Sequence, residues 1–361
     1  MTQANNVAIE SSQINSAGVL QPAGGGTGTA SGVTDFKNRI INGAMVIAQY
    51  GTGSFTPTVT GAFDYGTCDR WANEVSVASK FTVQQNQGSV TPPVGFTNYL
   101  GMTSSSSYSS AAGDYFTLRQ GIEGFNIADL GWGTANAKTV TMSFWVYSSL
   151  TGTFGGALAN STQGYSYPFS YSIPVANTWT YVSVTVPGPT GGAWLTNNNV
   201  GINVQFDLGS GSNYKSSPGV WSAAVYLGVT GGQSIVGTNG ATFYITGVQL
   251  EVGSSATNFA YRSIGTELAL CQRYYQNLLY NGGIISIRQY VSNVQRWFTP
   301  LQTQMRAIPT ISYVFSAALN LQTNNTSANT NGITWDIQYT SGGTGVIDIG
   351  NATTFTLSAE L

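Results

Sequence analysis

A two-residue alternation of apolar and polar side chains recurs along this chain and constrains its fold more than any other feature. Residues 201–208 (GINVQFDL) alternate without a fault, and residues 139–146 and 181–186 keep the same period. Successive side chains of a strand point to opposite faces, so each segment predicts a strand with one buried face. In residues 243–252 (FYITGVQLEV) the phase of the alternation changes at Gly247, which predicts a β-bulge.

The connections between these segments are longer than hairpin turns, as in residues 104–113 (SSSSYSSAAG). Many strands joined by long loops are typical of a jelly roll. The best helical segment is 266–275, with Thr266 as the expected N-cap and Glu267 in the first turn. Alternation then returns up to residue 361, interrupted by an expected polar loop at 324–327 (NNTS). The predicted fold class is all-β: an antiparallel β-sandwich (jelly roll) with an extended N-terminal segment and a small C-terminal β-domain entered by a short helix.

These patterns divide the chain into residues 1–38, 39–265 and 266–361. The first part contains the glycine run QPAGGGTGTASG at 21–32, which lacks the lysine of a phosphate-binding loop and the spacing of a dinucleotide fingerprint. Its glycines are expected to supply positive φ angles and hinge motion. The short apolar stretches of this part either pair as strands between chains of an oligomer or stay flexible.

Composition excludes several function classes. Only 7% of the residues are charged, against about 25% in ordinary soluble domains, and the net charge is −2. No basic patch for nucleic acid is present, no apolar window reaches the length of a membrane span, and no signal peptide pattern is visible. Cys68 and Cys271 are far apart in the sequence and are interpreted as small buried hydrophobic residues, although a disulfide between them stays open.

The chain has no histidine, which removes imidazole bases and histidine-based zinc sites. Its fourteen acidic residues are dispersed, and Asp69, next to Arg70, is expected to form a structural pair. We therefore expect no catalytic residue, no metal site and no cofactor. A carboxylate pair assembled from distant loops stays open as the enzymatic alternative.

Several segments in order resemble bacteriophage tail-fibre and receptor-binding proteins that carry a carbohydrate-binding-module-like sandwich. The matching segments are NRIINGAM (38–45), DRW (69–71), RQGIEG (119–124), VTMSFW (140–145), FYITGVQLEV (243–252) and ELALCQRYY (267–275). The resemblance is good over residues 39–275 and weak beyond them, and the GGTG element at 25–28 is similar to elements of fibre necks. It implies a homotrimer located in the virion, as a tail or other external appendage. Residues 1–38 would attach it to the baseplate or another virion protein.

Proteins bind sugars by stacking aromatic rings on the apolar faces of the sugar, while amides and carboxylates take the hydroxyls. Large aromatic residues in glycine-rich, non-alternating segments are therefore the ligand candidates. They are Trp132, Tyr165, Tyr167, Trp194, Tyr214 and Trp221, with Asn198 as a hydrogen-bonding partner. Three further tryptophans in or beside alternating segments are expected in the core instead: Trp71, Trp145 and Trp179.

The leading hypothesis is a tail fibre that adheres to host cell-surface glycan without catalysis. A capsid or baseplate decoration protein with a purely structural role is the first alternative, and a carboxylate-dependent polysaccharide depolymerase is the second. The sequence leaves open the host, the exact receptor and a bound calcium ion. It also leaves open whether residues 266–361 bind the receptor or only stabilise the assembly.

Overall fold

A computed structural model describes residues 36–280, 283–287, 295–314, 317–319, 321–339, 345–349 and 353–361. The chain divides between residues 38 and 39 into two compact units, 1–38 and 39–361. The predicted attachment segment, including its glycine run, lies outside the described residues apart from 36–38. The division of the remaining chain at residue 265, and the role of each part, stay predictions.

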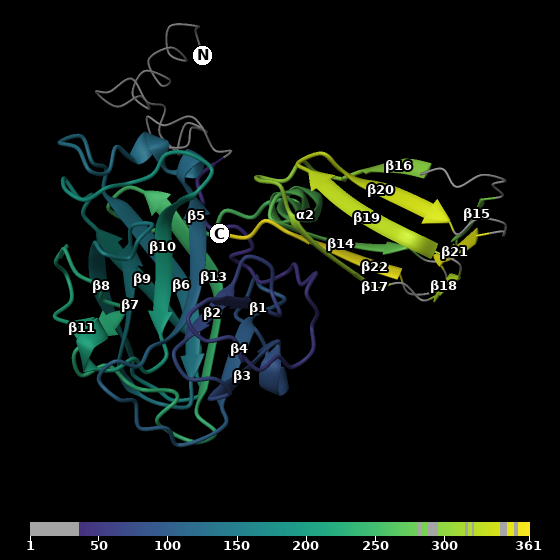
Figure 1. Ribbon diagram of the computed structural model, residues 1–361. Coiled ribbons are helices and arrows are strands. Elements are labelled where there is room, and N and C mark those ends of the chain that lie inside the picture. Colours follow the sequence, from purple (N-terminus) through teal and green to yellow (C-terminus); the bar gives the residue numbers. More distant parts are fainter. Residues whose placement is uncertain are drawn as a thin grey trace, which may run out of the picture. The chain divides into compact units, whose positions relative to one another are not determined.

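Two antiparallel sheets form the sandwich (Figure 1). The larger sheet has the order β1 (Phe63–Tyr65), β2 (Ala72–Val75), β5 (Phe116–Glu123), β10 (Val200–Asp207), β7 (Gly152–Ala159) and β8 (Ser166–Ile173). The smaller sheet has the order β3 (Phe81–Gln85), β4 (Leu100–Ser104), β13 (Thr242–Val252), β6 (Val140–Ser148) and β9 (Thr180–Val186). A short parallel pair is formed by β11 (Lys215–Ser216) and β12 (Gly228–Val229). Single 3₁₀ turns are η2 (Gln87–Ser89), η3 (Gly124–Asn126), η4 (Ala128–Leu130) and η5 (Ser212–Tyr214).

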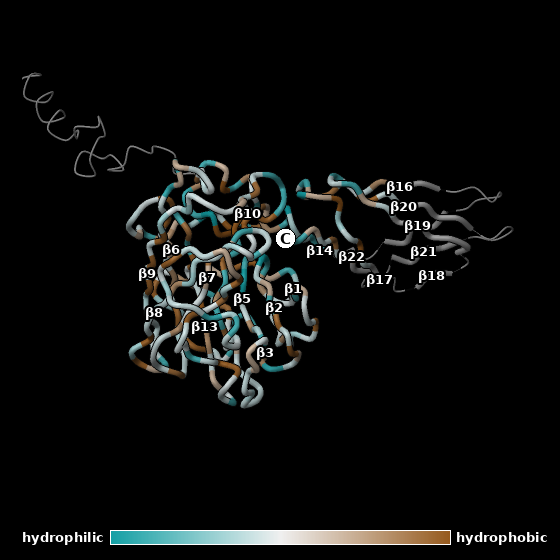
Figure 2. The backbone as a smooth tube through the Cα atoms, turned by 60° about the vertical axis from the view of Figure 1, so that its left-hand side comes forward, coloured by the Kyte–Doolittle hydropathy of each residue, from teal (hydrophilic) through white to brown (hydrophobic). Residues whose placement is uncertain are grey.

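The inner faces of the two sheets form the core that the alternation predicts. Val140, Met142, Phe144 and Val146 of β6 are all completely buried. Phe144 meets Phe206 of β10 from the opposite sheet, with ring centroids 5.1 Å apart. Hydrophobic and hydrophilic stretches are interspersed throughout the sandwich in Figure 2. The alternation therefore gave the correct buried face.

The predicted β-bulge in β13 is confirmed. The pairing of β13 with β6 shifts between Thr246 and Gln249, and Gly247 adopts a φ of +63°. A Cβ at Gly247 would lie 2.6 Å from Cζ of Phe96, so glycine also makes room for this ring. The bulge thus combines a left-handed backbone with a close side-chain approach, and both conditions favour glycine.

The three tryptophans expected in the core occupy different places. Trp71 is buried and the prediction is correct, but Trp145 and Trp179 are only half-buried. Trp145 occupies an outward-facing position of β6. Its ring centroid lies 5.3 Å from that of Tyr181, its partner on the neighbouring strand β9. Trp179, just before β9, contacts Tyr147 at 5.5 Å. The expectation was wrong for these two because position within a strand, and not residue type, decides which face a side chain occupies.

The short helix is present as α2 (Ile264–Gln272). Its N-cap is Ser263, whose side chain accepts a hydrogen bond from the backbone N–H of Thr266. The prediction of Thr266 as N-cap was therefore wrong, since the N-cap lies three residues earlier. Glu267 does lie in the first turn, and its carboxylate accepts hydrogen bonds from the backbone of Asn42 and from Arg262. Among the described residues no helix is long and apolar enough to cross a membrane.

The strands after α2 form three antiparallel three-stranded sheets. They are β14 (Tyr275–Tyr280), β22 (Thr353–Ser358) and β17 (Thr310–Val314); β15 (Gly283–Ile287), β21 (Gly345–Ile349) and β18 (Ala317–Leu319); and β16 (Gln295–Pro300), β20 (Gly332–Tyr339) and β19 (Leu321–Asn329). A separate hydrophobic cluster includes Met305, Ile333, Phe355 and Leu357.

Residues 324–327 lie inside β19, so the expected polar loop was wrong. The edge position of β19 explains why such a polar sequence is a strand, because one side of an edge strand needs no partner. The all-β fold class, with its sandwich and its helix-entered C-terminal strands, is confirmed.

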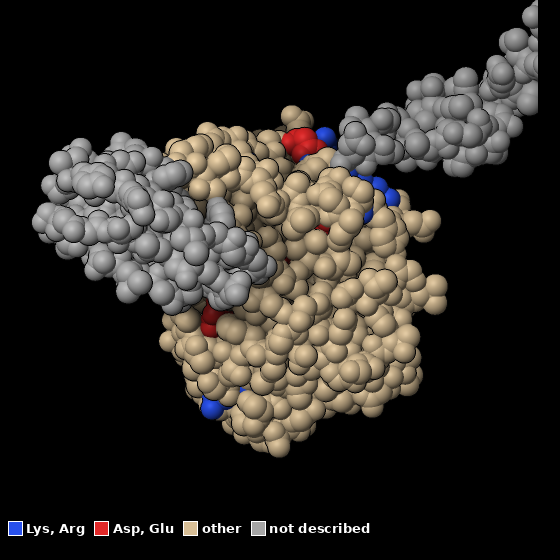
Figure 3. All heavy atoms as spheres, turned by 90° about the vertical axis from the view of Figure 1, so that its right-hand side faces the viewer, with Lys and Arg blue, Asp and Glu red and all other residues tan. Residues whose placement is uncertain are grey.

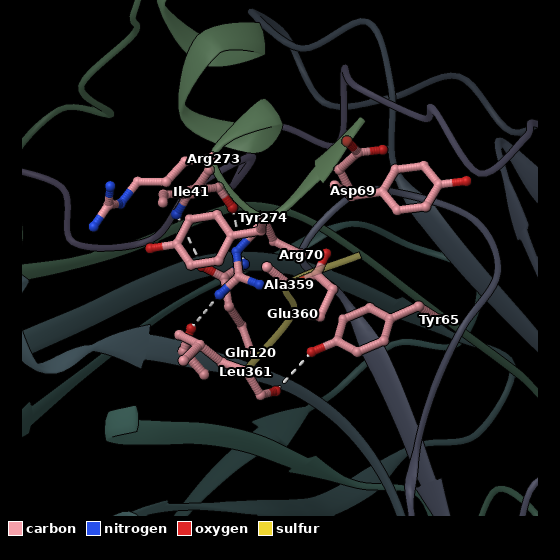
Figure 4. A network of polar contacts seen from close by, with 12 residues as sticks. Ile41, Tyr65, Asp69, Arg70, Gln120, Arg273, Tyr274, Ala359, Glu360 and Leu361 are labelled. Atoms are coloured by element: carbon pink, nitrogen blue, oxygen red, sulfur yellow. Dashed lines mark hydrogen bonds and ion pairs between the residues drawn. The ribbon is translucent and has the colours of Figure 1, made fainter. Parts of the chain in front are cut away.

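A polar junction joins the last residues of the chain to the sandwich (Figure 4). The buried guanidinium of Arg70 forms an ion pair with Glu360, 290 residues away, and donates a hydrogen bond to the carbonyl of Gly121 at 2.6 Å. It also lies 3.6 Å from the ring centroid of Tyr274. The hydroxyl of Tyr65 donates to the carbonyl of Leu361 at 2.8 Å. We call this group the Arg70 junction.

Asp69 does not form the expected hydrogen-bonded pair with Arg70. Its carboxylate accepts the backbone N–H of Gln49 at 2.6 Å and also the amide of the Gln49 side chain. That same amide donates to the carbonyl of Tyr275 at 2.9 Å, so Asp69 orients a contact with β14. Burial raises the pKa of Asp69 to about 6, against the lowering effect of the two hydrogen bonds from Gln49.

The two cysteines are both buried and free, as their interpretation as small hydrophobic residues predicts. Burial raises the pKa of each thiol well above its ordinary value. They are therefore packing groups and not reactive thiols.

Candidate functional site

Five of the seven predicted ligand residues lie in one aromatic cluster. Trp221 is at its centre, with its ring centroid 5.5 Å from that of Trp132 and 5.5 Å from that of Trp194. Tyr165 lies parallel to Trp221 at 5.7 Å, with an angle of 8° between the ring planes. Tyr167 lies 5.2 Å from Trp221. Residues from four separate segments thus meet in what we call the aromatic cluster.

Glycines allow these segments to approach the rings. Gly133 and Gly192 both have a φ of +83°, which side chains rarely adopt. A Cβ at Gly133 would lie 3.0 Å from Cδ1 of Trp194, and a Cβ at Gly192 would lie 2.8 Å from Cδ1 of Tyr165. The glycine-rich sequence around the aromatic residues is therefore the local reason why the rings can pack against backbone.

The three indole groups have fixed orientations. Each tryptophan donates its ring N–H to a backbone carbonyl, at 2.8 Å for Trp132, 3.0 Å for Trp194 and 2.7 Å for Trp221. The acceptor carbonyls belong, in that order, to Lys138, Gly191 and Pro187. Because the polar edge of each ring is already paired, its apolar face is what it offers to a ligand.

The aromatic cluster extends from the core to the surface. Trp132 and Tyr167 form its inner part and are each only 6% exposed. Leu195 and Val220, neighbours in sequence of the outer rings, are 36% and 62% exposed. The half-buried rings of the outer part are Tyr165, Trp194 and Trp221. A rigid inner layer therefore supports an outer layer that has surface left for contact.

Polar side chains lie next to the aromatic cluster, on the outward positions of the larger sheet. Gln163, two residues before Tyr165 in the β7–β8 turn, donates to both carboxylate oxygens of Glu74 at 3.3 Å. It accepts a hydrogen bond from the amide of Gln205 at 3.1 Å. Arg119 contacts the same carboxylate at 3.3 Å. We call these four residues, Glu74, Arg119, Gln163 and Gln205, the polar network.

The polar network retains hydrogen-bonding capacity. Among the described residues, no partner binds Nε of Arg119, Oε1 of Gln205 or Oγ1 of the neighbouring Thr117, although all three atoms are buried. Burial also lowers the pKa of the Arg119 guanidinium, with Glu74 acting in the opposite direction. Sequence reasoning missed these residues. The signal was present, since each occupies a polar position of an alternating strand or a turn.

The other two predicted ligand residues lie elsewhere. Tyr214 packs edge-on against Tyr115, with centroids 5.6 Å apart. The side-chain amide of Asn198 donates to the backbone carbonyl of Arg306 at 3.2 Å, and Arg306 donates to the backbone carbonyl of Asn198 at 2.6 Å. Asn198 therefore contacts the C-terminal part of the chain, and neither residue joins the aromatic cluster.

The arrangement is suited to binding more than to acid–base chemistry. The carboxylate of the polar network, that of Glu74, is already paired with Arg119 and Gln163. No group of three or more Cys, Asp or Glu side chains in the described part of the chain could hold a metal ion. Charged atoms are few on the face shown in Figure 3. Apolar ring faces beside neutral amides are the chemistry that this region offers.

No protein family and no curated protein matches the sequence. Solved structures similar to this chain include the enzymatically active domain of bacteriophage CBA120 tailspike protein 4, with 14% identity, a TM-score of 0.30, and coverage of 60% of this chain and 21% of that one. An arabinose-bound α-L-arabinofuranosidase matches with 13% identity and a TM-score of 0.34, over 60% of this chain and 26% of that one. A family 11 carbohydrate-binding module from Clostridium thermocellum matches with 12% identity and a TM-score of 0.27, over 58% of this chain and 99% of the module. This chain thus spans about a quarter or less of the first two proteins, and TM-scores this low assign no function to it.

Proposed function

We propose that this protein is a glycan-binding tail-fibre protein of a bacteriophage, which adheres to host surface polysaccharide through the aromatic cluster and does not cleave it. The observation that carries the proposal is the joining of Tyr165, Trp194 and Trp221, from three separate segments, into one half-exposed group of rings on a buried support. Sugars present apolar C–H faces that stack on such rings.

Glu74 and Gln163, the two half-buried members of the polar network, supply the second half of sugar recognition. Amide and carboxylate groups bind the hydroxyls at the rim of a pyranose ring, while the aromatic rings take its face. The β7–β8 turn places Gln163 and Tyr165 two residues apart, so both kinds of contact come from one turn. Each site binds weakly by itself, and several copies on one particle raise the avidity through effective concentration.

The virion part of the proposal is supported by the resemblance of segments such as FYITGVQLEV to tail-fibre and receptor-binding proteins. The proposal includes a homotrimer and attachment to the baseplate or another virion protein through residues 1–38. Sedimentation of the full chain should give three times its monomer mass of 38.0 kDa. Electron microscopy of the particle with a labelled chain separates a fibre tip from a capsid or baseplate decoration.

Binding is tested with the full chain, on host cells and on their purified polysaccharide. Trp194→Ala and Tyr165→Ala should each weaken adhesion at least about tenfold, because each removes one exposed ring face. Tyr181→Ala is the matched control, since Tyr181 is a 47% exposed ring on the outer face of the other sheet. Adhesion that survives Trp194→Ala and Tyr165→Ala unchanged contradicts the proposed site.

Absence of cleavage is tested separately. The polysaccharide is incubated with wild-type protein and assayed for new reducing ends and unsaturated sugars. We expect neither, because Glu74 is held in an ion pair by Arg119 and the aromatic cluster contains no carboxylate. New chain ends that disappear in Glu74→Gln would instead establish the depolymerase alternative.

A further inference from the structure

A cleft lies beside the loop that follows strand β10. This cleft of about 630 Å³ is lined by residues of the loops 107–110, 209–212 and 230–237, together with Lys215. Trp194 of the aromatic cluster lies before β10, and the 209–212 loop follows it. The lining of the cleft shares no residue with the aromatic cluster.

Most residues that line the cleft are small, and seven of them carry an aliphatic hydroxyl group. Of its thirteen lining residues, six are serine, one is threonine and four are glycine, and none has an aliphatic side chain. The side chains of Ser109, Ser212 and Thr230 form no hydrogen bond with another described residue. A hydroxyl both donates and accepts, so such a wall suits a ligand that carries hydroxyls of its own. The aromatic cluster, in contrast, offers ring faces.

Lys215 is the cation among the lining residues, and the buried carboxylate of Asp207 forms an ion pair with it. The carboxylate of Asp207 is buried, and its Oδ1 accepts the backbone N–H groups of Gly209 and Ser210 at 2.9 and 2.7 Å. Its Oδ2 lies 3.7 Å from Nζ of Lys215, which is an ion pair without a hydrogen bond. A Cβ at Gly228 would lie 2.2 Å from this Oδ2, so glycine is required behind the carboxylate. Asp207 is thus fixed by backbone groups, and it positions the ammonium group on the cleft wall.

Lys215 differs from the arginines of the described residues. Arg39, Arg70, Arg119, Arg262, Arg273 and Arg306 each donate hydrogen bonds to a carboxylate or to a backbone carbonyl, as Arg273 does to Glu123 at 2.7 Å. The Lys215 ammonium has three donors and only the Asp207 carboxylate at 3.7 Å. It is therefore a positioned cation with donors left for an anionic group.

We propose that this cleft binds one acidic sugar residue, whose carboxylate pairs with Lys215 and whose ring hydroxyls bond to Ser109, Ser212 and Thr230. The volume lies within the range of about 300 to 1,000 Å³ that is usual for small-molecule sites. The proposal rests on the proposed function and specifies its ligand class: a polysaccharide that contains uronic or similar carboxylate-bearing sugars. The aromatic cluster and the cleft then recognise different residues of the same polymer.

The experiment measures binding of glucuronic acid, its methyl ester and inorganic sulfate to the full-length protein by calorimetry. The acid should bind at least tenfold more tightly than the ester, because only the acid has a charge for Lys215. Sulfate should bind more weakly than the acid, because it lacks ring hydroxyls. Equal affinity for acid and ester, or sulfate binding as tight as that of the acid, overturns the proposal; the latter result means an anion site only.

Two sets of variants locate the binding. Lys215→Met should lower glucuronic acid affinity at least tenfold. The control is Lys138→Met, which removes a charge from an exposed lysine between η4 and β6 and should leave the affinity unchanged. The double variant Ser109→Ala/Ser212→Ala keeps the Asp207–Lys215 pair and should weaken both acid and ester severalfold. If Lys215→Met does not fold, this double variant tests the proposed site in its place. Undiminished acid binding in either folded variant refutes the proposed site.

The outcome is separable from that of the proposed function. Trp194→Ala should lose adhesion to polysaccharide and keep its affinity for glucuronic acid, since Trp194 does not line the cleft. Adhesion through the aromatic cluster without glucuronic acid binding leaves the proposed function standing and removes the acidic-sugar site. If the protein binds glucuronic acid but Trp194→Ala leaves adhesion unchanged, the acidic-sugar site stands and the aromatic cluster is removed as the adhesion site.

Discussion

The aromatic cluster and the Arg70 junction are both assembled from distant parts of the chain, and they differ in what holds them. The aromatic cluster is uncharged, grows out of the sandwich core and keeps part of its rings exposed. The Arg70 junction is built on a buried ion pair, a cation–ring contact and backbone carbonyls. Removing one ring from the first loses contact area, whereas removing one charge from the second leaves its partner buried and uncompensated. The difference assigns ligand contact to the first and chain assembly to the second.

The strongest test of this contrast is Arg70→Met. It leaves Glu360 and the carbonyl of Gly121 without their partner in a buried place, so we expect a loss of about 3–5 kcal/mol in the free energy of unfolding. Arg39→Met is the matched control, because the Asp129 partner of Arg39 is 47% exposed and such a pair contributes at most about 1 kcal/mol. Urea unfolding of both variants measures the two losses. A junction variant no less stable than the control would show that the ion pair does not hold the chain together.

The next effect concerns pH. Burial raises the pKa of Asp69 from 3.8 in the unfolded chain to about 6 in the folded protein. A raised carboxyl pKa favours the folded state at low pH, so this contribution is complete below pH 3.8 and is lost as the pH rises through about 6. The two pKa values correspond to about 3 kcal/mol. Unfolding of wild type and Asp69→Asn between pH 4 and pH 8 measures it as the difference between their pH profiles. Parallel profiles would contradict the raised pKa.

The two regions also show how far the sequence predicts this molecule. Alternation indicated the sandwich strands and the bulge at Gly247, and aromatic residues in glycine-rich segments indicated five members of the aromatic cluster. Both signals are local. The Arg70–Glu360 pair spans 290 residues, and no local pattern names the partner of a charge. The polar network was missed for a similar reason, because alternation shows that Arg119 and Gln205 face outward but not that Gln163 covers them. Tyr214 and Asn198 lie in loops of similar composition but away from the aromatic cluster, so composition alone does not show which loops meet.

A smaller effect tests the support of the aromatic cluster. Gly192→Ala places a Cβ in the left-handed region and also within 2.8 Å of the Tyr165 ring. Gly240→Ala is the control, with a φ of +74° and no atom within 4 Å of the added Cβ. Beyond the loss shared with this control, we expect a further loss of about 1–2 kcal/mol in stability and weaker polysaccharide adhesion. Equal losses in the two variants would mean that the ring moves aside freely and that the aromatic cluster is not rigid.

Salt should produce the smallest effect at the aromatic cluster, and it separates this site from the proposed cleft. Salt ions screen charges, and stacking on uncharged rings involves none. Adhesion through Trp194 and Trp221 to a neutral polysaccharide should therefore change less than about twofold between 0.05 and 0.5 M sodium chloride. Binding of glucuronic acid at Lys215 should weaken over the same range, because the Debye length shortens and the Lys215 side chain is 14% exposed. If neutral-polymer adhesion fell steeply with salt, charge would have to contribute at the aromatic cluster. One source of such charge is the polar network, and Arg119→Met, measured at both salt concentrations, would identify it.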